Sequence, residues 1–318
     1  MQKILVIGGS RYFGKHLVTL LRDTGDEVTV LNRGSAAPPP GVSRLVADRD
    51  DAAQLLEALG ARTFDTVVDQ VCYTPLQAAV ARRVFAGRTE RYVMTSTMEV
   101  YDPAPPTPEA RAYAEGKRRA EAVFRGGPEA GGPVAGGPVA GGPVAGRPET
   151  GGPETGGPAG GGPFDGGPAP FGFAAVRTAH VLGGGREEFT GRLAHYVGRI
   201  AAGTPVDVHA APYATSFIHH REIARFLQWA AGQSFTGAVD AASHGALDVL
   251  GLCELVADRV GRPARHRVVE QGAPASPFSF DRSYALDNSR AAGLGFGFGR
   301  VADWLPGAIT AELAEMAR

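Results

Sequence analysis

The sequence predicts an α/β fold built on a doubly wound parallel sheet, and two features support this prediction. Short apolar runs alternate with amphipathic segments along most of the 318 residues. Strands and helices in regular alternation are typical of parallel sheets that helices cover on both faces. The first apolar run, residues 3–7, also leads directly into a glycine-rich turn and a helical pattern, which is a common beginning for such sheets.

The first apolar run is too short to span a membrane and lacks a signal-peptide cleavage pattern, so we interpret it as a buried strand. The turn after it reads Gly-Gly-Ser-Arg-Tyr-Phe-Gly, and apolar residues then recur at helical spacing until Gly25. Strand, glycine turn and helix in this order present helix N-terminal amides to a pyrophosphate. We therefore favour a dinucleotide site over a plain tight turn. The contacts predicted in the turn are Gly8, Gly9, Ser10, Arg11, Tyr12, Phe13 and Gly14.

The later elements follow from the same two periodicities. Further strands are predicted at residues 28–31, 66–68, 91–95 and 173–177. Helices are predicted at residues 51–59, 75–85, 186–202, 222–231, 247–260 and 304–316, and one more carries Tyr113.

The composition indicates a globular protein of the cytoplasm. Hydrophobic residues make up 43% of the chain and the formal net charge is -1, so a large core is available and no general attraction to nucleic acid or membranes is expected. Cys72 and Cys253 are too few for a disulfide framework or a metal cluster. We expect no metal site, no nucleic-acid partner and no membrane partner.

Residues 126–170 interrupt the alternation with a five-residue Gly-Gly-Pro-type unit repeated nine times. Such a tract has almost no apolar mass to bury, and glycine maximises the entropy cost of ordering it. We predict a flexible insert in a surface loop, because the cost of closing a longer loop rises only logarithmically. A neutral repeat expansion is favoured over a docking arm.

A tyrosine and a lysine form the candidate catalytic pair. Tyr113 and Lys117 are four residues apart in the predicted helix that follows the strand ending at Thr97. This spacing places both side chains on one helix face, so a phenol and an ammonium can address one substrate atom. An ammonium that stabilises the phenolate lowers a phenol pKa, which is ordinarily about 10. The pair alone is common on helices, but its position after a dinucleotide-type unit favours proton transfer.

Together these motifs resemble the extended short-chain dehydrogenase/reductase superfamily, also called the NAD-dependent epimerase/dehydratase family. The residues similar to its glycine loop, its strand-end hydroxyl and its Y-x-x-x-K pair are Gly8, Arg11, Gly14, Thr97, Tyr113 and Lys117. Residues 216–224 are similar to its D-F-I-H-V-D-D-V-A segment and residues 286–290 to its D-x-S-K stretch. The GGxRxxG form of the loop, with Asn-Arg-Gly after the second strand, resembles an atypical branch.

The resemblance implies a Rossmann-type sheet with a smaller C-terminal substrate-binding domain. The dinucleotide-binding domain is then expected at residues 1–125 and 171–178, on either side of the insert at 126–170. Residues 179–318 mainly form the substrate-binding domain, with part of 214–247 returning to the Rossmann domain.

The resemblance also implies a mechanism. Tyr113 as phenolate exchanges a proton with a carbinol oxygen while hydride passes between the carbon and a nicotinamide. Thr97 holds that oxygen, and Lys117 lowers the tyrosine pKa and binds the nicotinamide ribose. The expected function is an NAD(P)-dependent epimerase, dehydratase or reductase acting on a small sugar-like or natural-product substrate. The alternative, an NAD(P)-binding or RNA-associated protein without activity, requires a basic face, and the near-neutral charge argues against it.

Cofactor choice is expected to depend on the end of the second strand. Asn32 occupies the position where an acid selects NAD, and Arg33 follows it. Because a guanidinium suits a phosphate by charge and geometry, NADP is predicted in preference to NAD, with a solvated Arg33 as the alternative. The further cofactor contacts that we expect are Asp48, Arg49, Val71 and Lys117.

The substrate is expected to differ from a nucleoside-diphosphate sugar. Thr215 and Ala292 stand where several family members that bind such sugars carry arginines. Arg177, Arg186 and Arg221 remain as anion contacts or as structural ion pairs. The residues predicted to line the substrate site are Tyr73, Glu99, His180 and Phe278, each with packing as the alternative role. Helices next to the active-site strand commonly pair in this family, so a homodimer is a further expectation.

Overall fold

The computed structural model describes residues 1–103, 105, 107–126, 169–270 and 272–318. Nearly all of the predicted insert, residues 126–170, therefore lies outside the described residues. Within the described ranges, no helix combines the length and the apolar character that a membrane span requires.

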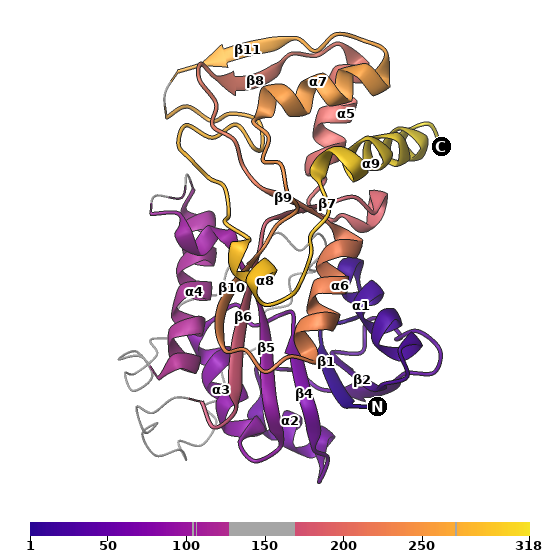
Figure 1. Ribbon diagram of the computed structural model, residues 1–318, viewed down its shortest axis with the longest axis vertical. Coiled ribbons are helices and arrows are strands. Elements are labelled where there is room, and N and C mark those ends of the chain that lie inside the picture. The colour runs from indigo at the N-terminus through magenta and orange to yellow at the C-terminus, as the bar shows by residue number, and fades with distance from the viewer. Residues whose placement is uncertain (104, 106, 127–168, 271) are drawn as a thin grey trace, which may run out of the picture.

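A seven-stranded sheet forms the centre of the molecule (Figure 1). Its order is β10-β6-β5-β4-β1-β2-β3, and every neighbouring pair is parallel. The strands are β1 Lys3–Ile7, β2 Glu27–Asn32, β3 Ser43–Val46, β4 Phe64–Asp69, β5 Thr89–Thr97, β6 Gly172–Thr178 and β10 Gly237–Ala241. The predicted doubly wound parallel sheet is confirmed, and its strand order reverses between β1 and β4. Ligands of such sheets bind beyond the carboxyl ends of the strands at this reversal.

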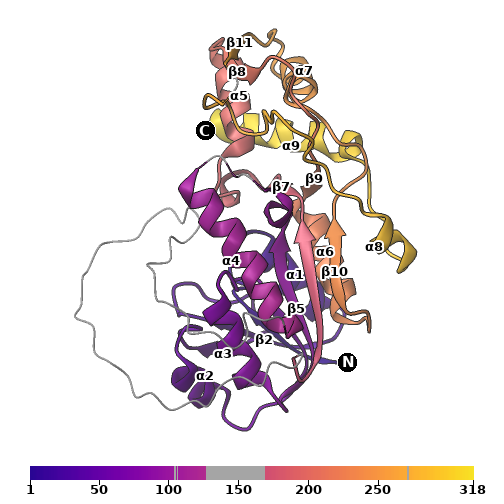
Figure 2. The ribbon, with the colours of Figure 1, turned by 90° about the vertical axis from the view of Figure 1, so that its left-hand side faces the viewer.

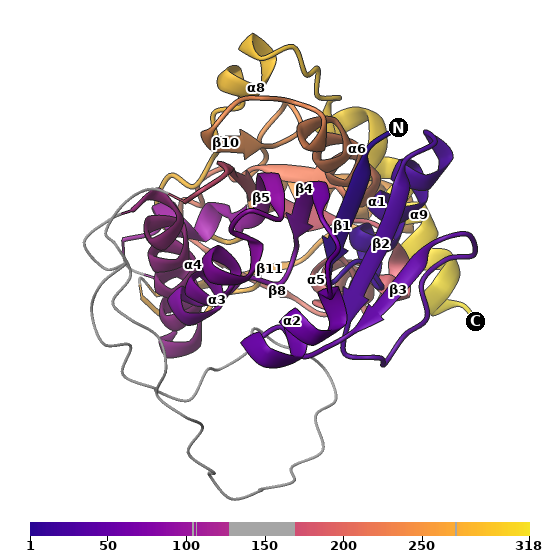
Figure 3. The ribbon, with the colours of Figure 1, turned by 90° about the horizontal axis from the view of Figure 1, so that it is seen from below.

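Helices cover both faces of the sheet (Figure 3). One face carries α1 Tyr12–Asp23 and α6 His220–Ala231, and the other carries α2 Ala52–Leu59, α3 Pro75–Phe85 and α4 Pro108–Arg125. The short helix α8 Ser289–Gly293 lies beside β10. Because both faces are covered, the inner strands are apolar at successive positions and show no polar alternation.

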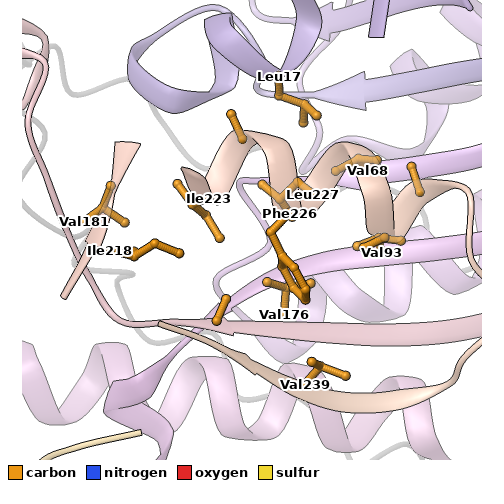
Figure 4. Packing of buried hydrophobic residues seen from close by; sticks show 14 of the residues in the cluster. Leu17, Val68, Val93, Val176, Val181, Ile218, Ile223, Phe226, Leu227 and Val239 are labelled. Atoms are coloured by element: carbon orange, nitrogen blue, oxygen red, sulfur yellow. The ribbon is translucent and has the colours of Figure 1, made fainter. Parts of the chain in front are cut away.

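Alternate residues of each inner strand belong to different hydrophobic clusters. Ile4 and Val6 of β1 lie in the cluster beneath α1 and α6, whereas Leu5 lies in the cluster beneath α2, α3 and α4. Figure 4 shows the first cluster, in which Ile223 and Phe226 of α6 face apolar side chains of the sheet. This packing fixes the position of the strand ends that carry the candidate site.

A smaller region follows the sheet in the chain and lies above it in Figures 1 and 2. It contains α5 Arg192–Ala202, α7 Val249–Val260, α9 Val301–Met316, and the parallel pair β8 Val206–His209 and β11 His266–Val269. Between this region and the sheet, β7 His180–Leu182 pairs with β9 Phe217–His219, and the 3-10 turns η1 Met98–Tyr101 and η3 Gly185–Glu187 precede α4 and α5 respectively. The division of the chain into domains stays a prediction, although β10 does return to the sheet beside β6.

The helix expected at residues 186–202 is shorter than predicted. Its first residues form the 3-10 turn η3, and α5 begins only at Arg192. Gly191 precedes α5 with a φ of 60°, a left-handed conformation that cannot continue a right-handed helix. The boundary therefore depends on one glycine, and it places Arg192 in the first turn of α5.

A close approach between α4 and the loop after β4 fixes the helix that carries Tyr113. At Gly116, a Cβ atom would lie 2.5 Å from the carbonyl oxygen of Tyr73. Any larger residue would therefore push α4 away from the carboxyl end of the sheet.

Gly116→Ala is expected to destabilise the protein. Alanine is favoured over glycine in a helix by up to about 1 kcal/mol, but overpacking costs about 1–3 kcal/mol. In α9, a Cβ at Gly307 meets nothing within 4 Å, so Gly307→Ala should instead raise the free energy of unfolding. Urea denaturation of both variants measures the difference, and a stabilised Gly116→Ala protein would contradict the close approach.

A buried ion pair closes the sheet interior at the end of β4. Arg49 Nη2 donates to Asp69 Oδ2 at 2.6 Å, and the hydroxyl of Tyr92 donates to the same oxygen at 2.5 Å. The amide of Val71 donates to Asp69 Oδ1 at 2.9 Å. The Asp69 side chain is 0% exposed, so its charge depends on these partners.

Asp69→Asn should lower the free energy of unfolding by about 3–5 kcal/mol, because it leaves the Arg49 guanidinium buried without a counter-charge. The matched change is Asp207→Asn, which breaks a two-bond ion pair with the exposed Arg267 and should cost only a small fraction of that loss. Chemical denaturation compares the two, and equal losses would contradict the role of burial.

Candidate functional site

The glycine turn connects β1 to α1 at the strand reversal of the sheet. Gly8 has a φ of 93°, and a Cβ there would lie 2.7 Å from Val71 Cγ1. At Gly14, a Cβ would lie 2.3 Å from Gln70 Oε1. The turn is therefore packed directly against the residues that follow β4, and the positive φ at Gly8 favours glycine there.

The residues around the turn fit a dinucleotide. The Nε2 atom of Gln70 is buried and has no hydrogen-bond partner among the described residues, and its side chain lies against the turn. A buried donor without a partner is costly, and a bound phosphate or ribose would supply an acceptor. The Tyr12 side chain packs on His220 of α6 at a ring distance of 5.8 Å, which leaves its main chain for the predicted cofactor contact.

The end of β2 is tied to the glycine turn by Asn32. Its Nδ2 donates to Ser10 Oγ at 2.6 Å, and its Oδ1 accepts from the amide of Gly34 at 2.9 Å. Arg44 of β3 donates from Nε to the same Oδ1 at 3.4 Å. Arg33 is exposed and forms no ion pair with any described residue. No carboxylate stands at this strand end.

The remaining predicted cofactor residues occupy different environments. Asp48 is half-buried and accepts from the amide of Asp50 at 3.0 Å. Val71 lies against the glycine turn, and exposed Arg11 caps α1. Arg49 points into the interior, where it pairs with Asp69, so its side chain stabilises the sheet edge and is directed away from solvent.

Thr97, Tyr113 and Lys117 converge at the carboxyl end of β5. Thr97 is the last residue of β5, and its hydroxyl accepts from the amide of Glu99 at 3.2 Å and favours the ionised form of Tyr113. Lys117 is 2% exposed and donates from Nζ to the carbonyl of Thr95 at 2.8 Å. Its ammonium lies 4.4 Å from the ring centroid of Tyr73 and 6.0 Å from that of Tyr113. The structure thus brings together the three residues that the motifs selected.

Burial controls the proton affinities of these groups. Burial, and then the neighbouring Tyr73, raise the pKa of Tyr113 well above its ordinary value, while the hydrogen bond from Thr97 and the charge of Arg192 lower it. Burial also lowers the pKa of Lys117 to about 8. The ammonium of Lys117 lies over Tyr73 and bonds to a main-chain carbonyl, and its expected effect on the Tyr113 pKa stays a prediction.

The residues predicted to line the substrate site lie around an aromatic wall. His180 is buried, and its ring lies 4.9 Å from Phe278 and 5.8 Å from Tyr284. The Tyr284 hydroxyl donates to Glu99 Oε2, and burial raises the pKa of that half-buried carboxyl. Tyr73 lies 6.2 Å from Tyr113 by ring centroids. Phe278 is also part of the core of the smaller region, so packing accounts for most of its surface.

Sequence reasoning missed Arg192, Tyr284, Gln70 and Arg44. Arg192 Nη1 lies 3.1 Å from His180 Nδ1, in the first turn of α5. In a helix predicted from residue 186 onward, Arg192 lies in the middle and has no special role. The one signal that the helix begins at Arg192 is Gly191, which precedes it in a left-handed conformation. Arg44 could have been found from the parallel pairing of β2 with β3.

Arg177, Arg186 and Arg221, for which the sequence allowed either an anion contact or a structural ion pair, lie in different environments. Arg177 donates to both carboxylate oxygens of Glu121, at 3.1 and 2.6 Å, and is a structural ion pair. Arg186 is exposed and lies 3.8 Å from Glu315; Arg221 is exposed. Thr215 is buried and donates to the carbonyl of Tyr284 at 2.7 Å, so this position supplies no cation to the site.

One family model matches the N-terminal part of the chain. The model of the NAD dependent epimerase/dehydratase family matches residues 4–74, from β1 to the residue before α3. No curated protein matches the sequence.

Solved structures are similar to the chain over its whole length. The Bordetella bronchiseptica enzyme WbmH, in complex with NAD+, has a TM-score of 0.67 at 17% identity, covering 100% of this chain and 99% of that one. A UDP-glucose 4-epimerase from Thermotoga maritima, with UDP-glucose, has a TM-score of 0.67 at 14% identity, covering 99% of each chain. A Thermus thermophilus UDP-glucose 4-epimerase, complexed with NAD, has a TM-score of 0.62 at 17% identity, covering 99% of this chain and 98% of that one.

At these identities the likeness establishes the fold. The resemblance to the NAD-dependent epimerase/dehydratase family that the motifs predicted is confirmed over residues 4–74 by the family model. The solved structures confirm the Rossmann-type fold over the chain as a whole.

Proposed function

We propose that this protein is an NAD(P)-dependent epimerase, dehydratase or reductase that transfers hydride at a carbinol or carbonyl carbon of a small sugar-like or natural-product substrate. The observation that supports this most is the convergence of Thr97, Tyr113 and Lys117 at the carboxyl end of β5. Ligands of this fold bind at that edge of the sheet, to which the glycine turn also belongs.

Each residue has a role that follows from its contacts. A bound nicotinamide would supply the hydride acceptor and donor for the carbinol or carbonyl carbon. Tyr113 takes the hydroxyl proton as the carbinol C–H bond breaks and the C=O bond forms, and returns that proton in the reverse direction. Thr97 holds the reacting oxygen by a hydrogen bond. Lys117 remains charged below its pKa of about 8 and is positioned to bind the ribose hydroxyls.

NADP is the cofactor that the end of β2 favours. The side-chain oxygen of Asn32, Oδ1, already accepts from Gly34 and Arg44. Arg33 and Arg44 are exposed beside it, and guanidinium groups bind phosphate in a two-bond geometry. The solved structures compared above that carry a dinucleotide hold NAD, and the proposed preference differs from theirs.

Arg33→Ala should weaken NADP binding by about 10- to 100-fold, the effect of losing hydrogen bonds to a charged group, and should leave NAD binding nearly unchanged. Calorimetric titration of both cofactors measures this. The control is Arg259→Ala, because Arg259 is an exposed arginine of α7. Equal affinities of the wild type for NAD and NADP would refute the preference.

The substrate is proposed to be something other than a nucleoside-diphosphate sugar, because the buried Thr215 offers no cation for a diphosphate. A cytoplasmic location is proposed because both cysteines are free and buried, as is usual in reducing compartments. Pairing of two copies through helices beside β5 stays a proposal from the family resemblance.

Tyr113→Phe should reduce turnover by at least about 10²-fold, because it removes the group that carries the proton. Cofactor affinity and melting temperature should stay near wild type. Tyr101→Phe is the matched control, because the Tyr101 hydroxyl bonds Asp240 and Arg177 on the outer side of the sheet. Substrates are found by screening carbonyl, polyol and sugar-phosphate compounds at the reduced-nicotinamide absorbance and by proton exchange at a carbinol carbon. Wild-type turnover by Tyr113→Phe would rule out the assignment.

A further inference from the structure

We propose that Arg192 binds an oxyanionic group of the substrate, a carboxylate or a phosphate, so that the protein acts on an acidic sugar-like compound. This inference rests on the proposed function, because it names the substrate class of the same site. Arg192 belongs to none of the sequence motifs. It also lies outside the family match, which ends at residue 74.

Three contacts fix the Arg192 guanidinium. Nε donates to Thr190 Oγ1 at 3.1 Å, Nη1 donates to His180 Nδ1 at 3.1 Å, and Cζ lies 5.3 Å from the ring centroid of Phe278. The side chain is half-buried. Its orientation is therefore established before any ligand arrives, which reduces the entropy cost of binding.

The two carboxyl groups that interact with the Arg192 charge, Glu99 and Glu188, are bonded to other donors. Within the described parts of the chain, Arg192 forms no ion pair. Glu188 accepts from the amides of Arg192 and Leu193 and from the Thr190 hydroxyl, so it caps α5. Glu99 accepts from Tyr284. Burial raises the pKa of both carboxyl groups, and the charge of Arg192 acts in the opposite direction.

The guanidinium acts on the same space as the catalytic tyrosine. The charge of Arg192 lowers the pKa of Tyr113, of Glu99 and of Glu188. Contacts connect the two places: Arg192 bonds His180, the His180 ring lies 5.8 Å from that of Tyr284, and Tyr284 donates to Glu99, two residues after the end of β5. An unpaired, partly desolvated cation is costly unless a ligand supplies the opposite charge.

His180 adds a second donor that has no partner. It is 5% exposed, and burial holds its pKa well below the ordinary value, so the ring is neutral. Because Nδ1 accepts from Arg192, the proton lies on Nε2, which has no hydrogen-bond partner among the described residues. A neutral donor beside a guanidinium suits an oxyanion better than a cation, and a carboxylate or phosphate has enough oxygens to engage both.

The first test measures anion binding and requires no knowledge of the substrate. The probes are inorganic phosphate and malonate, with glycerol as the neutral comparison, added to the full chain in the presence of NADP and followed by calorimetry. Arg192→Gln should weaken binding of at least one anion about 10- to 100-fold. Arg186→Gln, which changes an exposed arginine near the start of the same region, should have no effect.

Two further comparisons complete the test. Arg192→Lys keeps the charge but loses the planar fork, so it should bind the anions with intermediate affinity; it also serves if Arg192→Gln lowers the melting temperature. Preference for phosphate or for malonate distinguishes a phosphorylated from a carboxylated substrate. Absence of anion binding to the wild type, or equal binding to Arg192→Gln, overturns the inference.

Failure of the inference is distinguishable from failure of the proposed function. If NADP does not bind and Tyr113→Phe changes no activity, the proposed function fails, whereas Arg192-dependent anion binding can still be observed. If Tyr113-dependent turnover is found on a neutral compound and Arg192→Gln retains it, the function stands and the acidic substrate class is wrong.

Discussion

The geometry of the site depends on the contact between α4 and the loop that follows β4. Gly116 lets the Tyr73 carbonyl approach the helix to a distance that no side chain would permit. This contact orients one face of α4, so that Tyr113 meets Thr97 and Lys117 reaches the main chain of β5. The glycine turn is held to the same loop by Val71 and Gln70. One loop therefore couples the cofactor end of the sheet to the proton-transfer end.

Burial, more than pairing of charges, sets the chemistry of this region. It raises the pKa of Tyr113 and lowers that of Lys117. Two such side chains four residues apart on a helix would by themselves be expected to favour each other's charged forms. A buried phenol that loses its proton becomes a strong base, which suits the removal of a hydroxyl proton. The Arg49–Asp69 ion pair is buried in the interior and is separate from Thr97, Tyr113 and Lys117.

Recognition is distributed over segments that differ from those of the catalytic groups. The end of β2 and the neighbouring strand β3 provide Asn32, Arg33 and Arg44, whose arrangement favours a phosphate on the cofactor. The start of α5 provides Arg192 beside His180. In the proposed function, hydride and proton transfer depend on Thr97, Tyr113 and Lys117, while these loops select the molecules that enter the site.

The sequence by itself determined the β1–turn–α1 unit, the alternation of strands and helices, and the candidate residues Thr97, Tyr113 and Lys117, because each depends on spacing within a short segment. It did not determine the interior position of Arg49, the start of α5 or the selection of Arg192. The first and the last depend on contacts between separate elements, Arg49 with Asp69 and Arg192 with His180, whereas the start of α5 depends on the left-handed conformation of Gly191. The pKa values of Tyr113 and Lys117 also required the tertiary structure, because burial is a property of the assembled fold and of no single segment.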